Sequence, residues 1–460
     1  MRVFVVENVV EKFREECVKN FLTCTYSIIV KAIYKEVLII MSQDKFALLG
    51  NICYSTGPNK IHTIERGYLV VSGDKIVGAF DTLPDEYSGV RVEDYGEALI
   101  IPGMTDLHVH APQFPFRGIG MDLELLDWLN TYTFPEEAKY SSIDYAEKIY
   151  EFFTQALKAS PITRAVIFST IHVPATRILF DKLEASGLIS YVGKVNMDRN
   201  SPDDLRETTT TSLADTELLI NEAKNYKRTH AILTPRFTPS CSDDLMKGLG
   251  DLKAKYDLPV QSHLCENPSE VELVRELCPT SKNYADTYDR FGLLDDKAIM
   301  AHCVYLNDDE IELMKARKSF VAHCPQSNIN LASGIAPVKK FLELGINVGL
   351  GTDIAAGASL SMFRAITDAI GVSKLYWRLV DEDFHALTFS ETFYMATMGG
   401  GKFFGQVGSF LPGYEADVLV LDEKNSGVRR DNLLERLEQT IYLADENVIL
   451  IAKYVAGKKL

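Results

Sequence analysis

The strongest constraint on the fold of this chain is an alternation of short apolar runs and long amphipathic stretches between residues 99 and 405. The short runs are rich in β-branched residues and have the length of buried strands. The longer stretches, such as 143–158 and 214–226, have the apolar spacing of helices. Eight such units predict an α/β fold, a (β/α)₈ TIM-like barrel. The candidate strands are 98–104, 164–170, 191–197, 230–237, 258–263, 298–302, 319–324 and 346–353.

The two ends of the chain differ from this middle part. Residues 68–80 form two β-rich runs around Gly73-Asp74, which is typical of a hairpin. Residues 411–422 and 448–458 are also rich in β-forming side chains. We therefore predict a small β-sandwich domain that both chain ends build together. The expected division is an N-terminal extension at 1–43, the small domain at 44–98 and 406–460, and the barrel catalytic domain at 99–405.

Composition narrows the choice of partners and compartment. The formal net charge of −16 argues against nucleic acid or an anionic membrane surface as the main partner. Charged side chains interrupt the first forty residues, so neither a signal peptide nor a membrane span is predicted there. The chain is too large to need disulfides for stability, so its eight cysteines are expected to be reduced thiols in the cytoplasm.

Polar side chains gather where the predicted strands end. In a barrel, the carboxyl ends of the strands converge on one mouth, where active sites form. Five of the nine histidines of the chain fall at such positions, which predicts the active site there. The residues are His108, His110, Arg236, His263, His302, His323 and Asp353.

The spacing of two histidines indicates a metal site. His108 and His110 are two positions apart, so on a strand both imidazoles leave the same face and can hold one divalent ion. His263 could supply a third imidazole. Asp353 follows a Gly-rich apolar strand, where a buried carboxylate needs a cation; the alternative is an N-cap of the helix beginning near residue 359. Three nitrogens and a carboxylate suit Zn²⁺, one per chain, although Fe²⁺ or Mn²⁺ would also bind.

Further residues suggest catalytic roles around this metal. Glu266 is predicted to carry protons, because hydrolysis of a C–N bond needs an acid to protonate nitrogen; the alternative is a solvated loop carboxylate. His302 is expected to contact the reacting water or the developing oxyanion. His323 could be structural or could support a ligand, and His172 is expected to be structural. Cys265 is expected to pack, because a thiolate ligand would close the open coordination position.

Together these motifs resemble the amidohydrolase superfamily of metal-dependent barrel hydrolases. The matching pattern is Pro-Gly-x-x-Asp-x-His-x-His ending at His110, His-x-x-Glu ending at Glu266, the later His302, and Gly-Thr-Asp ending at Asp353. Within the superfamily the chain is most similar to the guanine deaminase family, over about residues 44–460. The stretches that carry this similarity are 110–113, 125–136, 193–198, 234–237, 262–267 and 323–334.

The resemblance implies an activity and a residue set. The activity would be zinc-dependent hydrolytic deamination of guanine, a small-molecule purine, to xanthine and ammonia by a cytoplasmic homodimer. The implied metal ligands are His108, His110, His263 and Asp353, and the implied catalytic residues are Glu266, Asp353 and His302. The implied substrate-binding residues are His110, Gln113, Trp128, Arg236, Phe237, His263, Glu266 and Asp353.

Chemistry gives the substrate-binding residues distinct roles. Arg236 can donate to O6 of guanine, and Gln113 can donate and accept. Phe237 and Trp128 could stack on the ring. The alternatives are that Arg236 pairs with a carboxylate such as Asp198 and that Trp128 belongs to the core. Two other functions stay open: a related amidohydrolase that deaminates another nitrogen heterocycle, and a barrel without metal that serves as a scaffold.

Overall fold

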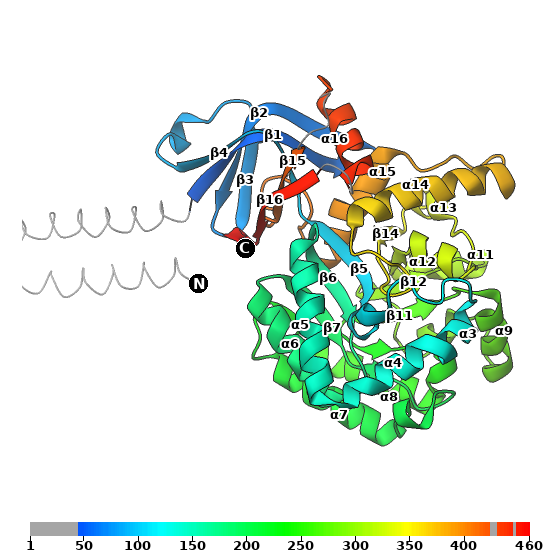
Figure 1. The fold of residues 1–460 in the computed structure, drawn as a ribbon. Helices are drawn as coiled ribbons and strands as arrows, with labels where there is room; N and C mark the ends of the chain where they lie inside the picture. Colours follow the sequence, from blue (N-terminus) through cyan, green and yellow to red (C-terminus); the bar gives the residue numbers. More distant parts are fainter. Residues whose placement is uncertain (1–44, 424–429, 445–447) are drawn as a thin grey trace, which may run out of the picture.

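The structure, a computed structural model, describes residues 45–423, 430–444 and 448–460. A β-sheet built from both chain ends lies against a larger part in which strands and helices alternate (Figure 1). The expected extension at 1–43 lies outside the described residues. No helix in the described part of the chain is long and apolar enough to cross a bilayer.

The two chain ends pair in one seven-stranded sheet of order β17-β16-β15-β4-β1-β2-β3. Strands β1 and β4 are parallel, and the other neighbours are antiparallel. The β2–β3 hairpin turns through Gly73 and Asp74, which confirms the predicted hairpin. Because the described terminal strands belong to one sheet, the second layer of a sandwich stays a prediction. The strands are β1 (Lys45–Gly57), β2 (Lys60–Ser72), β3 (Lys75–Phe80), β4 (Arg91–Pro102), β15 (Val418–Glu423), β16 (Val448–Val455) and β17 (Lys458–Lys459).

The apolar run 98–104 does not form one strand with the histidines, so this part of the prediction was wrong. Its first residues complete β4, where Leu99 pairs with β15. The chain breaks at Gly103, whose position cannot hold a side chain because a Cβ atom would collide with Thr163. A new strand, β5 (Met104–His110), then carries the histidines. The Pro-Gly pair therefore marks the passage from one sheet to another.

The middle of the chain forms parallel strands in two four-stranded sheets, β5-β6-β7-β9 and β11-β12-β13-β14, with a small β8–β10 pair beside them. Every residue of β6 is buried, as expected for a strand covered on both faces. The predicted strand 230–237 is divided into β9 and β10. The strands are β6 (Ile162–Phe168), β7 (Ile189–Gly193), β8 (Val195–Asn196), β9 (Thr229–Ala231), β10 (Thr234–Pro235), β11 (Val260–Leu264), β12 (Ala298–His302), β13 (Phe320–His323) and β14 (Asn347–Leu350).

Backbone hydrogen bonds link the two parallel sheets on both sides. Gln261 N–H donates to the carbonyl of Leu233 at 2.9 Å, which joins β11 to the chain after β9. Asp353 N–H donates to the carbonyl of His108 at 2.8 Å, which joins the end of the last strand to the first. Side chains from both sheets also meet in one buried apolar cluster of Leu107, Val166, Ile232, Ile299, Ala301, Phe320 and Ala322. The two sheets therefore share an interior.

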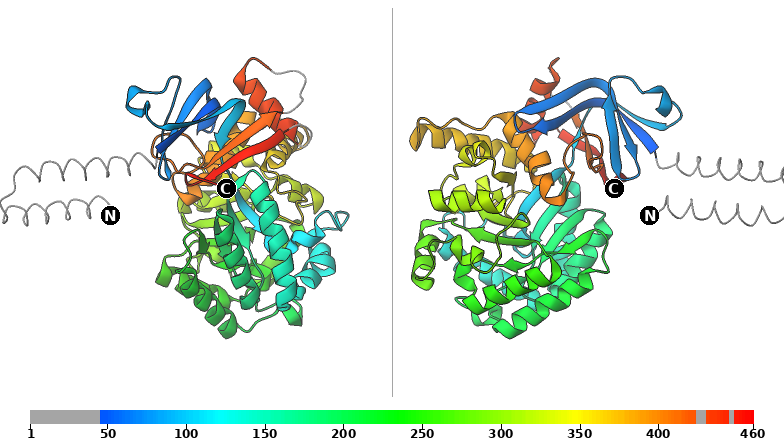
Figure 2. Two further views of the ribbon diagram at one scale, coloured as in Figure 1. Left: turned by 60° about the vertical axis from the view of Figure 1, so that its left-hand side comes forward. Right: turned by 180° about the vertical axis from the view of Figure 1, so that it is seen from behind.

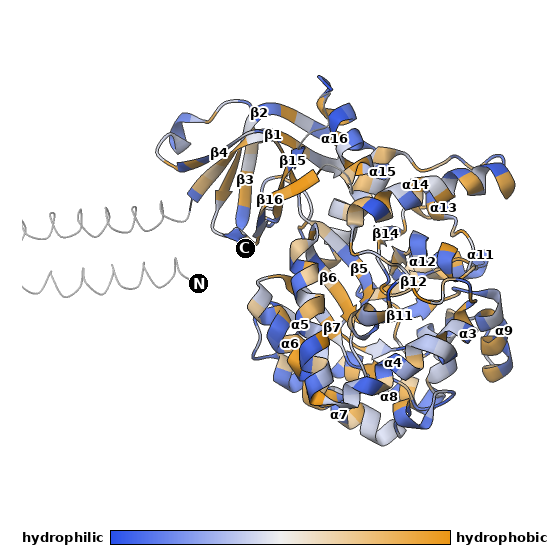
Figure 3. Ribbon diagram, in the orientation of Figure 1, coloured by the Kyte–Doolittle hydropathy of each residue, from blue (hydrophilic) through white to orange (hydrophobic). Residues whose placement is uncertain are grey.

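Helices cover the outside of these strands, as the views in Figures 1 and 2 show. Their surfaces alternate between apolar and polar residues, and the apolar side of α5 packs on the core (Figure 3). The helix predicted at 143–158 corresponds to α5. The helix predicted at 214–226 corresponds to α7, which begins and ends a few residues earlier. The helices are α3 (Leu125–Trp128), α4 (Phe134–Ala138), α5 (Ile143–Ala159), α6 (Val173–Ser186), α7 (Thr209–Ala223), α8 (Asp243–Tyr256), α9 (Pro268–Leu277), α10 (Asp286–Asp289), α11 (Asp308–Arg317), α12 (Pro325–Asn330), α13 (Val338–Glu343), α14 (Met362–Leu379), α15 (Phe389–Tyr394) and α16 (Leu433–Tyr442).

Candidate active site

Three imidazoles meet at the carboxyl ends of β5 and β11. His108 and His110 leave the same face of β5, as their spacing predicts. The Nε2 atom of His110 lies 3.2 Å from Nε2 of His108 and 3.2 Å from Nε2 of His263. Burial lowers the pKa of His110 and of His263 well below the usual 6.5, so both rings are neutral at pH 7.

The hydrogen bonds of this cluster direct a lone pair toward its centre. His263 Nδ1 lies 2.6 Å from the carbonyl oxygen of Arg236, which can only accept a hydrogen bond. The proton of the neutral His263 ring therefore sits on Nδ1, and its Nε2 faces His110 as an acceptor. Asp353 Oδ1 completes the group at 3.2 Å from His108 Nε2 and 3.5 Å from His110 Nε2. Four electron-pair donors so placed need a cation between them.

The separations also have the right size for a metal ion. Tetrahedral zinc with bonds of about 2.0–2.1 Å holds its ligand atoms about 3.3 Å apart. The distances above, 3.2 to 3.5 Å, agree with that value. The structure therefore brings His108, His110 and His263 together as one candidate metal group and places the fourth predicted ligand, Asp353, beside His108 and His110. The measured separations fit a divalent ion.

Asp353 is held in place by its backbone. It has a positive φ of 49° directly after Thr352, a conformation that persists where the surroundings over-determine it. Burial by itself would raise the pKa of Asp353, but His108, His302 and His110 outweigh burial and hold it well below 3.8. The carboxylate is thus charged. Helix α14 is capped by Ser361, so the alternative in which Asp353 caps a helix was wrong.

A second buried carboxylate, Asp106, ties the two strands of the metal site together. Its Oδ1 accepts from the N–H groups of His108 (3.1 Å) and Thr352 (3.0 Å), and its Oδ2 accepts from the Thr352 hydroxyl at 2.5 Å. Burial raises the pKa of Asp106 to about 6. The sequence analysis assigned no role to Asp106 beyond its place in the motif that ends at His110. The signal for a structural role is its position two residues before His108, on the same face of the strand.

Glu266 and His302 form a second group beside Asp353, in addition to the three imidazoles described above. Glu266 sits between β11 and Asn267, the N-cap of α9. His302 Nε2 is 3.5 Å from Glu266 Oε2 and 3.7 Å from Asp353 Oδ2. Asn328 Oδ1 lies 2.9 Å from His302 Nδ1 and orients the ring. Burial, together with the charge of Asp353, raises the pKa of Glu266 well above 4.5, which favours the protonated form relative to a free carboxyl group.

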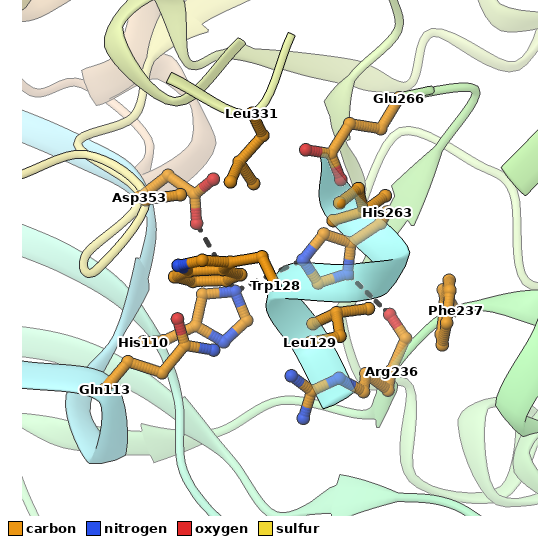
Figure 4. A pocket seen from close by; sticks show the side chains of 12 residues that line it. His110, Gln113, Trp128, Leu129, Arg236, Phe237, His263, Glu266, Leu331 and Asp353 are labelled. Carbon is orange, nitrogen blue, oxygen red and sulfur yellow. Dashed lines mark hydrogen bonds and ion pairs between the residues drawn. The ribbon is translucent and has the colours of Figure 1, made fainter. Parts of the chain in front are cut away.

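A pocket opens onto this cluster (Figure 4). It includes every residue for which substrate binding was predicted, and apolar side chains complete its walls. Trp128 is both a core and a pocket residue, because it packs on Phe116, donates from Nε1 to the carbonyl of Ile119 at 3.1 Å and still lines the cavity. The lining residues are His110, Gln113, Leu125, Trp128, Leu129, Arg236, Phe237, His263, Glu266, Leu331, Asp353 and Ala356.

Arg236 has a carboxylate partner, but it is not the one named as the alternative. Its Nη1 lies 2.5 Å from Oε2 of Glu137, and its Nη2 lies 3.1 Å from Oε1. Asp198 instead accepts hydrogen bonds from Ser242 and Thr209. The expected alternative partner Asp198 was therefore wrong. Glu137 was missed because 99 residues separate it from Arg236, and no local pattern connects them.

The remaining residues that the sequence singled out lie around the site. His323 ends β13, and burial lowers its pKa to about 3. His172 precedes α6 and belongs to neither group of candidate metal ligands among the described residues. Cys265 packs with its thiol 3.7 Å from Glu310, as expected. Cys324, which was not predicted, has its sulfur within 4.8 Å of the donor atoms of His108, His302 and Asp353.

The fold and the site define a class: a hydrolase with parallel α/β sheets, in which candidate metal ligands at the carboxyl strand ends lie beside a buried acid and a small pocket. Residues 99–459 match the Amidohydrolase family. Guanine deaminase of Homo sapiens is 39% identical over 376 residues, 78% of this chain and 82% of the relative. Guanine deaminase of Escherichia coli is 35% identical over 86% of this chain and 91% of the relative. The chain belongs to the amidohydrolase family, in its guanine deaminase branch.

A solved structure agrees with this placement. Guanine deaminase from C. acetobutylicum, with bound guanine in its active site, superimposes with a TM-score of 0.87 at 46% identity. The match covers 90% of this chain and all of that one. An adenosine deaminase from Xanthomonas campestris, solved with bound zinc, has the same fold at 23% identity and a TM-score of 0.75.

Proposed function

We propose that this protein is a guanine deaminase, which hydrolyses guanine to xanthine and ammonia. The observation that carries the proposal is one pocket that joins a cluster of candidate metal ligands and the buried acid Glu266 to Gln113, Arg236 and Phe237. The relatives with this name match over most of their length, and one solved structure holds guanine at its active site.

We infer that His108, His110, His263 and Asp353 hold one zinc ion per chain. The support is the convergence of the imidazole nitrogens and the Asp353 carboxylate at one place. When bound, zinc lowers the pKa of water toward 7 and polarises the substrate. Iron and manganese accept the same donors, so the identity of the metal is part of the proposal.

The side chains around the metal can move the protons that this reaction needs. Asp353 is charged and can accept a proton from the attacking water. Glu266, whose pKa is raised, can deliver a proton to the ring nitrogen beside C2. It can then take up the proton of the oxygen added at C2 and pass it to the exocyclic nitrogen. His302, oriented by Asn328, can donate to or accept from the oxygen added at C2. Water adds, the C–N bond breaks, and ammonia leaves.

Other pocket residues can bind the purine. Arg236 and Gln113 offer N–H groups to the 6-oxygen. Phe237 and Trp128 present ring surface on which a planar ligand can pack. Burial of the whole group excludes water from the reacting carbon, which strengthens each of these interactions.

One experiment tests activity and metal together. Purified protein is incubated with guanine, adenine, cytosine and melamine, ammonia is followed, and the metal of the same sample is measured by mass spectrometry. We expect ammonia from guanine and about one zinc per chain. His108→Ala should lose the metal, while His230→Ala, on β9 beside Tyr191, should keep it. Activity confined to a ring that is not a purine would overturn the proposal.

We also propose the larger architecture that the sequence predicts. The two parallel sheets, linked on both sides, form one (β/α)₈ barrel that begins with β5 and extends to about residue 405. The chain ends form the small domain, which on its N-terminal side extends to the end of β4 rather than to residue 98. The enzyme acts as a cytoplasmic homodimer. All six described cysteines are buried and free, which suits a reducing compartment. Light scattering after gel filtration measures the oligomeric state.

A further inference from the structure

We propose that Glu137 is a positioning residue that makes this pocket select an oxygen rather than an amino group at the 6-position of a purine. The inference deepens the proposed function and rests on it. Glu137 lies on α4, outside the group of metal ligands, and does not line the pocket itself. It acts through Gln113 and Arg236, two polar residues that line the pocket (Figure 4).

Glu137 binds both of these residues at once. Its side chain is buried, with only 1% of the residue exposed. Oε1 accepts from Gln113 Nε2 at 3.0 Å and from Arg236 Nη2 at 3.1 Å, and Oε2 accepts from Arg236 Nη1 at 2.5 Å. The ring of Phe134, from the same helix, lies 5.2 Å from the Arg236 guanidinium carbon. One helix therefore fixes the guanidinium by charge and by an aromatic contact.

These contacts determine which way the amide of Gln113 points. The amide oxygen accepts from Ala355 N–H at 3.1 Å, and the amide nitrogen donates to Glu137. A flipped amide would place its oxygen against the Glu137 carboxylate and its NH₂ against the Ala355 N–H, which loses both hydrogen bonds. Glu137 and Ala355 thus hold Gln113 in a single orientation.

As a result, Gln113 and Arg236 offer the ligand hydrogen-bond donors and no acceptor. Gln113 keeps one N–H that Glu137 does not use, and Arg236 keeps N–H groups beyond the two directed at the carboxylate. Donors match a 6-oxo group, which accepts, and leave a 6-amino group without an acceptor. Without Glu137 the amide is free to flip and to accept from an amino group, and the buried guanidinium loses its partner.

The test compares two neighbouring glutamates. Glu136 precedes Glu137 on the same helix, but its carboxylate accepts from Lys139 at 2.6 Å and from the Tyr145 hydroxyl instead. Glu137→Gln and the control Glu136→Gln are titrated, as metal-loaded enzyme, with hypoxanthine and with adenine by calorimetry. These ligands differ in the substituent at the 6-position and in the ring proton that accompanies it. We expect the dissociation constant for adenine divided by that for hypoxanthine to fall about tenfold in Glu137→Gln and to stay unchanged in Glu136→Gln.

A second variant keeps the test decisive. If Glu137→Gln does not fold, Glu137→Asp retains the charge but withdraws the carboxylate, and a ratio lowered at least about threefold is expected. For guanine, KM should rise more than kcat falls, with metal content unchanged. An adenine-to-hypoxanthine ratio of dissociation constants within twofold of the wild type, or an equal change in Glu136→Gln, overturns the proposal. The calorimetric titrations measure binding without turnover, so they test the role of Glu137 alone. Absence of ammonia from guanine would instead contradict the proposed function.

Discussion

Replacing Asp106 by alanine should weaken metal binding although Asp106 is not one of the proposed ligands. Its carboxylate joins β5, which carries His108, to Thr352, which precedes Asp353. The two ends of the ligand set come from positions 245 residues apart in the sequence, from 108 to 353. The buried Asp106 side chain fixes the positions of the segments around His108 and Asp353 relative to each other.

The magnitude follows from the hydrogen bonds that are lost. Three donors, the N–H groups of His108 and Thr352 and the Thr352 hydroxyl, lose their acceptor. Each buried donor left unsatisfied costs about 1–3 kcal/mol, so the free energy of unfolding should fall by about 3 kcal/mol or more. Residues that orient metal ligands typically change metal affinity by about 10–100-fold when removed. Asp106→Asn keeps one acceptor oxygen and should lie between the wild type and Asp106→Ala.

Two measurements separate stability from metal binding. Urea unfolding of the metal-free proteins gives the stability change, and competition with a chelator gives the dissociation constant for zinc. Asp198→Ala is the matched control, because Asp198 also accepts three hydrogen bonds, from Ser242 N–H (2.7 Å), the Ser242 hydroxyl (2.5 Å) and the Thr209 hydroxyl (2.7 Å). This control should lose stability and keep its zinc affinity.

The reasoning would be refuted by a zinc dissociation constant for Asp106→Ala within twofold of the wild type. It would also fail if Asp198→Ala weakened zinc as much as Asp106→Ala did. In that case, loss of global stability rather than local orientation would explain the effect on the metal.

Three further substitutions test the site and its support. Glu266→Gln should keep zinc and lose about 100-fold or more of kcat, because the amide cannot carry the proton; near-normal turnover measured by ammonia release would contradict this. Asp417→Ala removes the main partner of the buried Arg164, whose Nε lies 2.7 Å from Asp417 Oδ2, and urea unfolding should show a loss of about 3 kcal/mol. The pKa of Glu93 is lowered to about 2, because hydrogen bonds from Lys459 and two tyrosines outweigh burial. This carboxylate therefore stabilises the fold above about pH 4.5, and its contribution is lost as the pH falls toward 2. Glu93→Gln should remove that part of the acid dependence, and an unchanged slope of stability against pH would argue against it.

Local patterns predicted three of the candidate metal ligands, His108, His110 and Asp353, because each of these has a local signature. His108 and His110 need only the two-residue period of a strand to share a face. Asp353 needs only a buried strand before it, where a charged group requires a cation. The burial of these side chains and their mutual distances agree with those arguments.

Other expectations failed where a distant segment decides the outcome. The run 98–104 has uniform apolar character, yet it belongs to two sheets because Gly103 must pass close to Thr163. The strand expected at 230–237 is split because its two parts pair with different neighbours, β7 and β8. Hydropathy alone contains no information about which neighbour a strand will meet.

The amino-acid sequence by itself determined the alternating α/β architecture, the cluster of metal ligands and the membership of the family, because these depend on short-range periodicity and on residue chemistry. The tertiary structure alone decided the partners of the charged groups. It placed Glu137 between Gln113 and Arg236, and Asp106 against Thr352. The reason is physical: a buried charge takes whichever counter-charge or donor the fold brings within about 3 Å, and that neighbour can come from anywhere in the chain.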